Sequence, residues 1–194
     1  MKQEETTSVV LVGVGGQGIL LASEIVARAA MNSGCRVKAN EVHGMAQRGG
    51  SVIAQIRYGR EVHSPIVTEG TARVLGSLER IEALRYAHYL APGGLAVVSS
   101  QMVVPITVSM GEAEYPSDAE NRLRKTFPRL VYLNTAEMAK ELGNIRAANV
   151  LILGALSTGL NMDSDAWLQA IARCVPERHR DVNLKAFEMG RNSP

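Results

Sequence analysis

The sequence predicts an α/β fold: a single layered domain over residues 1–194, with a mostly parallel sheet, one β-hairpin and a helical C-terminal third. A β-branched run, Ser8 to Val12, is followed by glycines and then by apolar residues at helical spacing, which is typical of a strand–helix–strand unit. Further short strand-like runs continue to Leu133, and helical patterns dominate after it. The chain contains no internal repeat, low-complexity tract or linker, so one domain is expected.

The first third of the chain is predicted to form the first strands of the sheet and the first helix. Ile19 to Asn32 forms a helix, because its apolar residues recur three and four positions apart. Arg36 to Ala39 follows as the second strand. Ser51 to Tyr58 is the next strand, and a Gly-Arg turn joins it to Glu61–His63 to make the expected hairpin.

The remaining elements alternate at first and then become helical. Glu79 to Leu90 and Asp118 to Thr126 are predicted helices. The predicted strands between and after them are Leu95–Ser99, Val103–Met110 and Leu130–Leu133. Thr135 is a candidate cap for a helix that ends at Gly143. The last three predicted helices are Ile145–Leu160, Ser164–Cys174 and Pro176–Met189.

Composition excludes several functions. The formal net charge is +2, which argues against nucleic-acid binding driven by bulk charge. Cys35 and Cys174 are too few for an iron–sulfur cluster, which usually needs about four thiolates, and the histidines are scattered, so no metal site is expected. Met1 to Thr7 lacks a signal-peptide core, and the apolar stretch Val150–Leu160 is short of the ~20 residues of a membrane span. These features predict a soluble cytoplasmic protein with no membrane contact.

The first candidate site is the glycine-rich turn Gly13-Val14-Gly15-Gly16-Gln17-Gly18 between the first strand and the first helix. Glycines allow backbone angles closed to other residues, and they let a ligand approach the free N–H groups at a helix start. The turn is therefore a candidate phosphate site.

Several interpretations of this turn remain open from the residues alone. Its glycines match G-x-G-x-x-G, and Glu41 stands near the position of a ribose-binding acid, so a NAD-dependent oxidoreductase is one alternative. A P-loop is excluded, because Ile19-Leu20 occupy the positions that require Lys and Ser/Thr. The turn could also be purely structural, as in a non-catalytic scaffold subunit.

The second candidate site is the polar segment from Glu41 to Ser51, which places an acid, an imidazole, an amide and a guanidinium among glycines. Arg48 could present its planar guanidinium to a phosphate or carboxylate. It could equally pair with Glu41 on a solvated loop. Chemistry alone does not choose between these interpretations.

Together the two motifs resemble the paired signature of the gamma subunit or domain of 2-oxoacid:ferredoxin oxidoreductases. The motifs are Gly13-Val14-Gly15-Gly16-Gln17-Gly18-Ile19 and Glu41-Val42-His43-Gly44-Met45-Ala46-Gln47-Arg48-Gly49-Gly50-Ser51. The resemblance covers essentially the whole chain. Tyr115-Pro116, Leu153-Gly154-Ala155-Leu156 and Asn183-Leu184-Lys185-Ala186-Phe187 are similar to the indolepyruvate branch, in which this chain would be the small subunit.

The resemblance implies an accessory subunit, with no catalytic residue in this chain alone. Enzymes of the family decarboxylate a 2-oxoacid on thiamine diphosphate, pass electrons through iron–sulfur clusters to ferredoxin and transfer the acyl group to coenzyme A. A large partner subunit would carry the thiamine diphosphate and the clusters. The turn residues Gly13, Gly15, Gly16, Gln17 and Gly18 would face the phosphates of coenzyme A, while His43, Gln47 and Arg48 would lie toward the shared active site.

Two further features have weaker functional interpretations. Asn149 stands in an apolar helix, where packing against a backbone partner is favoured over ligand contact. A basic cluster consists of Arg122, Arg124, Lys125 and Arg129. Such clusters are mostly solvated surface, and docking of an acidic ferredoxin is the alternative.

Overall fold

A computed structural model describes residues 6–44, 49–104, 108, 110–111 and 114–193. These residues form a six-stranded sheet in the order β2-β3-β1-β4-β5-β6. The strands are β1 Thr7–Val14, β2 Arg36–His43, β3 Ser51–Gly59, β4 Ala72–Ser77, β5 Leu90–Ser99 and β6 Leu130–Leu133. Strands β1, β4, β5 and β6 pair in parallel, whereas β3 runs antiparallel to both of its neighbours, β1 and β2. The predicted α/β class and mostly parallel sheet are confirmed.

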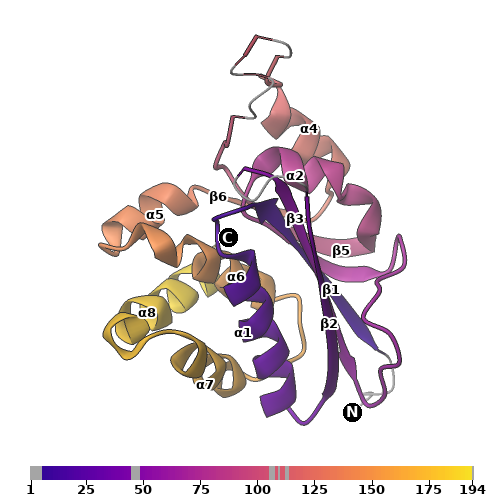
Figure 1. The fold of residues 1–194 in the computed structure, drawn as a ribbon, viewed down its shortest axis with the longest axis vertical. Coiled ribbons are helices and arrows are strands. Elements are labelled where there is room, and N and C mark those ends of the chain that lie inside the picture. Colours follow the sequence, from indigo (N-terminus) through magenta and orange to yellow (C-terminus); the bar gives the residue numbers. More distant parts are fainter. Residues whose placement is uncertain (1–5, 45–48, 105–107, 109, 112–113, 194) are drawn as a thin grey trace.

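The helices lie on both faces of this sheet (Figure 1). They are α1 Ile19–Asn32, α2 Arg80–Arg85, α4 Ala119–Thr126, α5 Thr135–Glu141, α6 Ala148–Ser157, α7 Ser164–Cys174 and α8 Arg180–Arg191, with short 3-10 turns η1 Ala87–Tyr89, η2 Ile145–Ala147 and η3 Glu177–His179. Residues of α1, α6, α7 and α8 share one apolar core with one face of the sheet. Residues of α2 and α4 share a second core with the other face. The predicted helical C-terminal third is confirmed.

The hairpin exists, but its predicted position was wrong. Strand β3 pairs with the preceding β2, from Arg36 opposite Gly59 to His43 opposite Val52, and Glu61 to His63 form no strand. The reason is that β3 has β1 on its other side, so neither of its edges is free to accept another strand. The segment after β3 instead returns across the sheet face, where the backbone N–H of Val67 donates to Gln55 Oε1 at 2.8 Å.

Two other strand predictions need correction. The described residues between Val103 and Met110 form no strand. Strand β4 was missed, because its sequence, Ala72 to Ser77, is short and interrupted by Arg73 and Gly76. It lies nearly at the centre of the sheet, and its buried residues alternate between the two cores.

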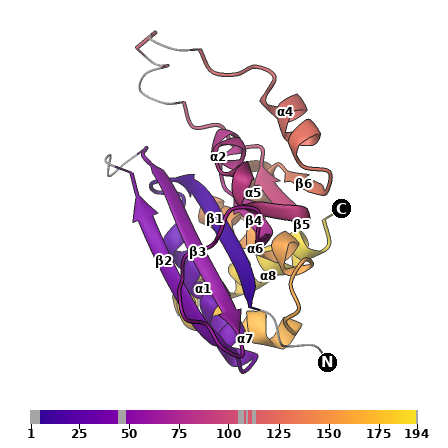
Figure 2. The same cartoon turned by 90° about the vertical axis from the view of Figure 1, so that its right-hand side faces the viewer.

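The strand order creates a switch point between β1 and β4. The chain leaves β1 through α1 toward β2 on one side, whereas β4 leads to β5 and β6 on the other. In open α/β sheets, ligands bind outside the carboxyl ends of the strands at such a point. The glycine-rich turn lies here, directly after β1 (Figure 2).

Candidate functional site

The glycine-rich turn connects β1 to α1 and leaves the start of the helix open. Gly16 and Gly18 have φ of 101° and 84°, which side-chain-bearing residues rarely adopt. Gly18 precedes α1 without a side-chain cap, and the first turn of α1 contains no acidic residue. The first N–H groups of α1 therefore remain available to an anion.

Gln17 holds this turn against the neighbouring strands. Its Oε1 accepts from the backbone N–H of Val14 at 2.7 Å, and its Nε2 donates to the carbonyl of Leu78 at 2.9 Å and to Gln101 Oε1 at 3.1 Å. One amide thus joins the segments that follow β1, β4 and β5. These bonds use both N–H groups of Gln17, so its main role in this structure is to position the turn rather than to donate to a ligand.

A cavity of about 430 Å³ adjoins the turn. It is lined by Gly16, Gln17, Gly18, Leu21, Leu78, Gln101, Ile145, Arg146, Ala148 and Asn149. Among the described residues that form this lining, Arg146 is the only charged one, and the others carry glycine, amide and aliphatic groups. The cavity thus combines an apolar wall, an open helix start and one guanidinium, a mixture suited to an anionic nucleotide-like ligand.

Asn149, on α6, contacts the turn from the other end of the sequence. Its Nδ2 donates to the carbonyl of Gly18 at 3.2 Å, which confirms the expected bond to backbone. The residue is only 3% exposed, and its Oδ1 has no hydrogen-bond partner among the described residues. Because Asn149 also lines the cavity, it carries an unused buried acceptor at the edge of the site.

The second motif meets the first. The backbone N–H of Gly15 donates to the carbonyl of Gly50 at 2.8 Å, which joins the two segments across the β1–β3 pair. His43 is exposed at the end of β2. Gln47 and Arg48 lie outside the described residues.

A buried acidic network, which sequence reasoning missed, lies beside this junction. Glu79 and Glu82 are 2% and 6% exposed, and they line a cavity of about 240 Å³ together with Val14, Gly49 and Ser51. The Ser51 hydroxyl donates to Glu82. This bond anchors the end of the second motif to α2.

Tyr115 belongs to the same hydrogen-bond network. Its hydroxyl donates to Glu79 Oε1 at 2.8 Å and accepts from Arg80 Nε at 2.9 Å. Burial raises the pKa of Tyr115 to about 12, against the lowering effect of the Arg80 guanidinium, so the phenol stays protonated at neutral pH. The sequence pointed to Tyr115 only through the resemblance of Tyr115-Pro116 to the indolepyruvate branch. Nothing in the sequence indicated its partner Glu79, which is 36 positions away.

The strand order argues against the dinucleotide interpretation. A NAD-binding fold places its ribose-binding acid at the end of the strand next to β1. Here Glu41 is on β2, and β3 lies between β2 and β1. Two strand spacings amount to ~10 Å, and Glu41 does not line the cavity at the turn.

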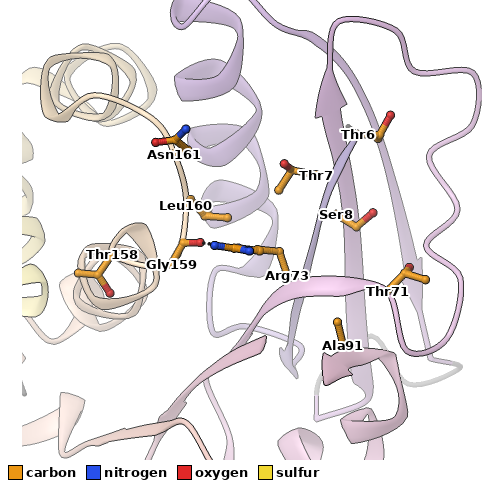
Figure 3. Close-up of a pocket in the computed structure, with 10 residues that line it drawn as sticks. All are labelled: Thr6, Thr7, Ser8, Thr71, Arg73, Ala91, Thr158, Gly159, Leu160 and Asn161. Carbon is orange, nitrogen blue, oxygen red and sulfur yellow. Dashed lines mark hydrogen bonds between the residues drawn. The ribbon is translucent and has the colours of Figure 1, made fainter. Parts of the chain in front are cut away.

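A larger cavity, of about 610 Å³, lies at the opposite edge of the sheet (Figure 3). Its lining is polar and comes from the starts of β1 and β4 and from the turn after α6. Arg73 reaches across it and donates from Nε to the carbonyl of Gly159 at 3.2 Å. Arg73 therefore caps the end of α6, and this cavity is separate from the glycine-rich turn.

Two of the four side chains of the basic cluster pair with carboxylates at the start of α4. Arg122 pairs with Asp118 at 2.9 Å, and Arg124 pairs with Glu120 at 2.8 Å. Arg129 Nη1 donates to the carbonyl of Gly93 at 2.8 Å. These contacts do not favour the docking of an acidic protein at this cluster.

No helix among the described residues is long and apolar enough to cross a membrane. No group of three or more His, Cys, Asp or Glu side chains in the same part of the chain is arranged to hold a metal ion.

The fold and site define an α/β domain with a glycine-rich turn and an uncapped helix start at the switch point of its sheet. The family model described as pyruvate ferredoxin/flavodoxin oxidoreductase matches residues 8–193, and the chain belongs to this family. Indolepyruvate oxidoreductase subunit IorB of Thermococcus kodakarensis is 42% identical over 188 residues, which cover 94% of this chain and 93% of the relative. The chain is thus an accessory subunit of a 2-oxoacid:ferredoxin oxidoreductase, which confirms the resemblance of its motifs.

Solved structures agree with this assignment. The gamma subunit of a keto/oxoacid ferredoxin oxidoreductase from Geobacter sulfurreducens has a TM-score of 0.68 and 26% identity, over 95% of both chains. The 2-oxoglutarate:ferredoxin oxidoreductase from Magnetococcus marinus has a TM-score of 0.71 and 20% identity, over 97% of this chain and 31% of that one. The second likeness shows that the same fold forms part of a longer chain.

Proposed function

We propose that this chain binds coenzyme A at its glycine-rich turn and completes the active site of a complex that oxidises a 2-oxoacid, with indolepyruvate as the preferred substrate. A large partner subunit holds the thiamine diphosphate and the iron–sulfur clusters, and electrons leave the complex to ferredoxin. The observation that carries this proposal is the cavity at the switch point, with an open helix start and one guanidinium.

The residues of the cavity fit coenzyme A. Its phosphates match the free N–H groups of α1. Its pantetheine and adenine parts match the aliphatic wall formed by Leu21, Leu78 and Ile145. The structure of the Magnetococcus marinus enzyme, which shares this fold, has coenzyme A and succinyl-CoA bound. When bound, coenzyme A supplies the thiol that accepts the acyl group; the residues of this chain hold and orient it.

His43, Gln47 and Arg48 are proposed contacts to the shared active site. Support comes from the bond between Gly15 and Gly50, because it brings the end of the second motif to the glycine-rich turn.

Exposed apolar side chains support a partner at the same edge. Leu20, Met102 and Ile145 are 50%, 48% and 74% exposed. Leu20 is in the first turn of α1, Met102 follows β5, and Ile145 lines the cavity, so all three surround the switch point. Exposed apolar residues gathered beside a site are typical of an interface.

Calorimetric titration of the assembled complex with coenzyme A and with NAD tests the ligand assignment. We expect saturable binding of coenzyme A and none of NAD, because Glu41 is displaced from the turn by β3. Binding of NAD without coenzyme A would favour the dinucleotide alternative. Binding of neither would favour a scaffold subunit whose turn is only structural.

A further inference from the structure

Arg146 lies across the cavity from the glycine-rich turn and was not among the residues singled out from the sequence. It is exposed on η2, and its side chain makes no hydrogen bond or ion pair with any other described residue. The bond recorded for this residue is made by its backbone N–H, which donates to Asn144 Oδ1 at 3.0 Å. The guanidinium is therefore free to bind a ligand.

The position of Arg146 relative to the turn is fixed by Asn149. The two residues are three positions apart, one on η2 and the other on α6, and this spacing places two side chains on one face of a helix, with Cβ atoms ~5–6 Å apart. Asn149 contacts Gly18 directly, so the face of the chain that carries Arg146 is turned toward the glycine-rich turn. Both residues line the same cavity as Gly16 and Gly18.

A second observation shows that this corner of the cavity is built for a ligand. Asn149 is only 3% exposed, yet its Oδ1 accepts no hydrogen bond from any described residue. Buried polar atoms nearly always have a partner. The unpaired acceptor therefore marks an incomplete corner beside the open helix start and the guanidinium, two groups that bind phosphate.

We infer that Arg146 binds a phosphate of the nucleotide portion of coenzyme A, opposite the amino terminus of α1, and so sets the affinity of the complex for the whole coenzyme. This inference rests on the proposed function. Arg146 should not affect the affinity for an acceptor thiol that lacks the nucleotide, because such a thiol offers no anion to the guanidinium.

Steady-state kinetics of the assembled complex test the inference with coenzyme A and with pantetheine, which carries the thiol but no phosphate. Arg146→Gln should raise the KM for coenzyme A by about 10-fold, as loss of a charge-assisted hydrogen bond predicts, and leave kcat unchanged. The KM for pantetheine should be the same in both complexes. Arg146→Lys should recover part of the loss, since it keeps the charge but not the planar guanidinium.

Arg60→Gln is the matched control, because Arg60 is exposed after β3 at the opposite edge of the sheet. It should leave both KM values unchanged. An assembled Arg146→Gln complex with wild-type KM for coenzyme A would overturn the inference while leaving the proposed function intact. Failure of both Arg146 variants to assemble would also overturn it, because Arg146 would then belong to the subunit interface. Wild-type turnover that does not depend on coenzyme A would instead overturn the proposed function.

Discussion

Gly16 and Gly18 occupy the same turn but are constrained differently. Both have positive φ, so either substitution strains the backbone. A Cβ on Gly16 would meet no atom within 4 Å, whereas one on Gly18 would lie 2.6 Å from Asn149 Nδ2. Gly18 is thus required both for its backbone angle and for the contact with α6.

This difference predicts unequal losses of stability. Gly16→Ala should lower the free energy of unfolding by about 1–2 kcal/mol, the cost of a left-handed backbone. Gly18→Ala should lower it by about 1 kcal/mol more, because it also displaces the hydrogen bond from Asn149. Urea denaturation of the two variants measures the difference. Equal losses would contradict the role assigned to Asn149.

At the residue scale, the sequence predicted the glycine-rich turn but not what surrounds it. The turn is formed by consecutive residues, so its glycine pattern can be recognised in the sequence. Arg146 and Asn149 reach it from more than 120 positions away, as the 131-residue separation of Asn149 and Gly18 illustrates. Gln17 was identified as a ligand contact from its place in the motif, and only the positions of Leu78 and Gln101 show that its amide holds the turn.

Two glycines set the distance between helices α6 and α8. A Cβ on Gly154 would collide with the carbonyl oxygen of Phe187 and would lie 2.8 Å from the backbone nitrogen of Arg191. A Cβ on Gly190 would collide with the carbonyl oxygen of Leu151. Helix α6 is almost wholly buried, since every one of its residues after Ala148 belongs to the buried class. The two helices therefore cannot separate without opening the core.

Alanine substitutions at this crossing should be strongly destabilising. Gly154→Ala and Gly190→Ala should each lower the free energy of unfolding by about 3 kcal/mol, at the upper end of the usual cost of overpacking. Because one substitution already forces the helices apart, the double variant should lose less than the sum. Denaturant unfolding of the three variants measures this, and strictly additive losses would contradict a shared contact.

At the element scale, most helices were predicted from apolar spacing, because that spacing is local. The strand order was not predictable in the same way. Strand β3 takes the place between β1 and β2, and this insertion determines where the hairpin lies. It also explains the error at Glu61 to His63: the alternation there is strand-like, but the edge that it would need is already paired.

At the scale of the whole molecule, the carboxyl edge of the sheet gathers the features that matter for function. The glycine-rich turn, the end of the second motif and the cavity with Arg146 all lie there. The exposed apolar residues Leu20, Met102 and Ile145 surround them. This one-sided arrangement fits a subunit that presents a ligand to a partner.

Ferredoxin reduction by reconstituted complexes tests most sharply whether this chain supplies the coenzyme A site of a two-subunit enzyme. The large subunit, this chain and their mixture are each supplied with a 2-oxoacid and ferredoxin, with and without coenzyme A. We expect rapid turnover only in the mixture with coenzyme A, because this chain supplies the coenzyme A site and the partner supplies the redox centres. Ferredoxin reduction by this chain alone, or equal coenzyme A-dependent turnover by the large subunit alone, would contradict the account.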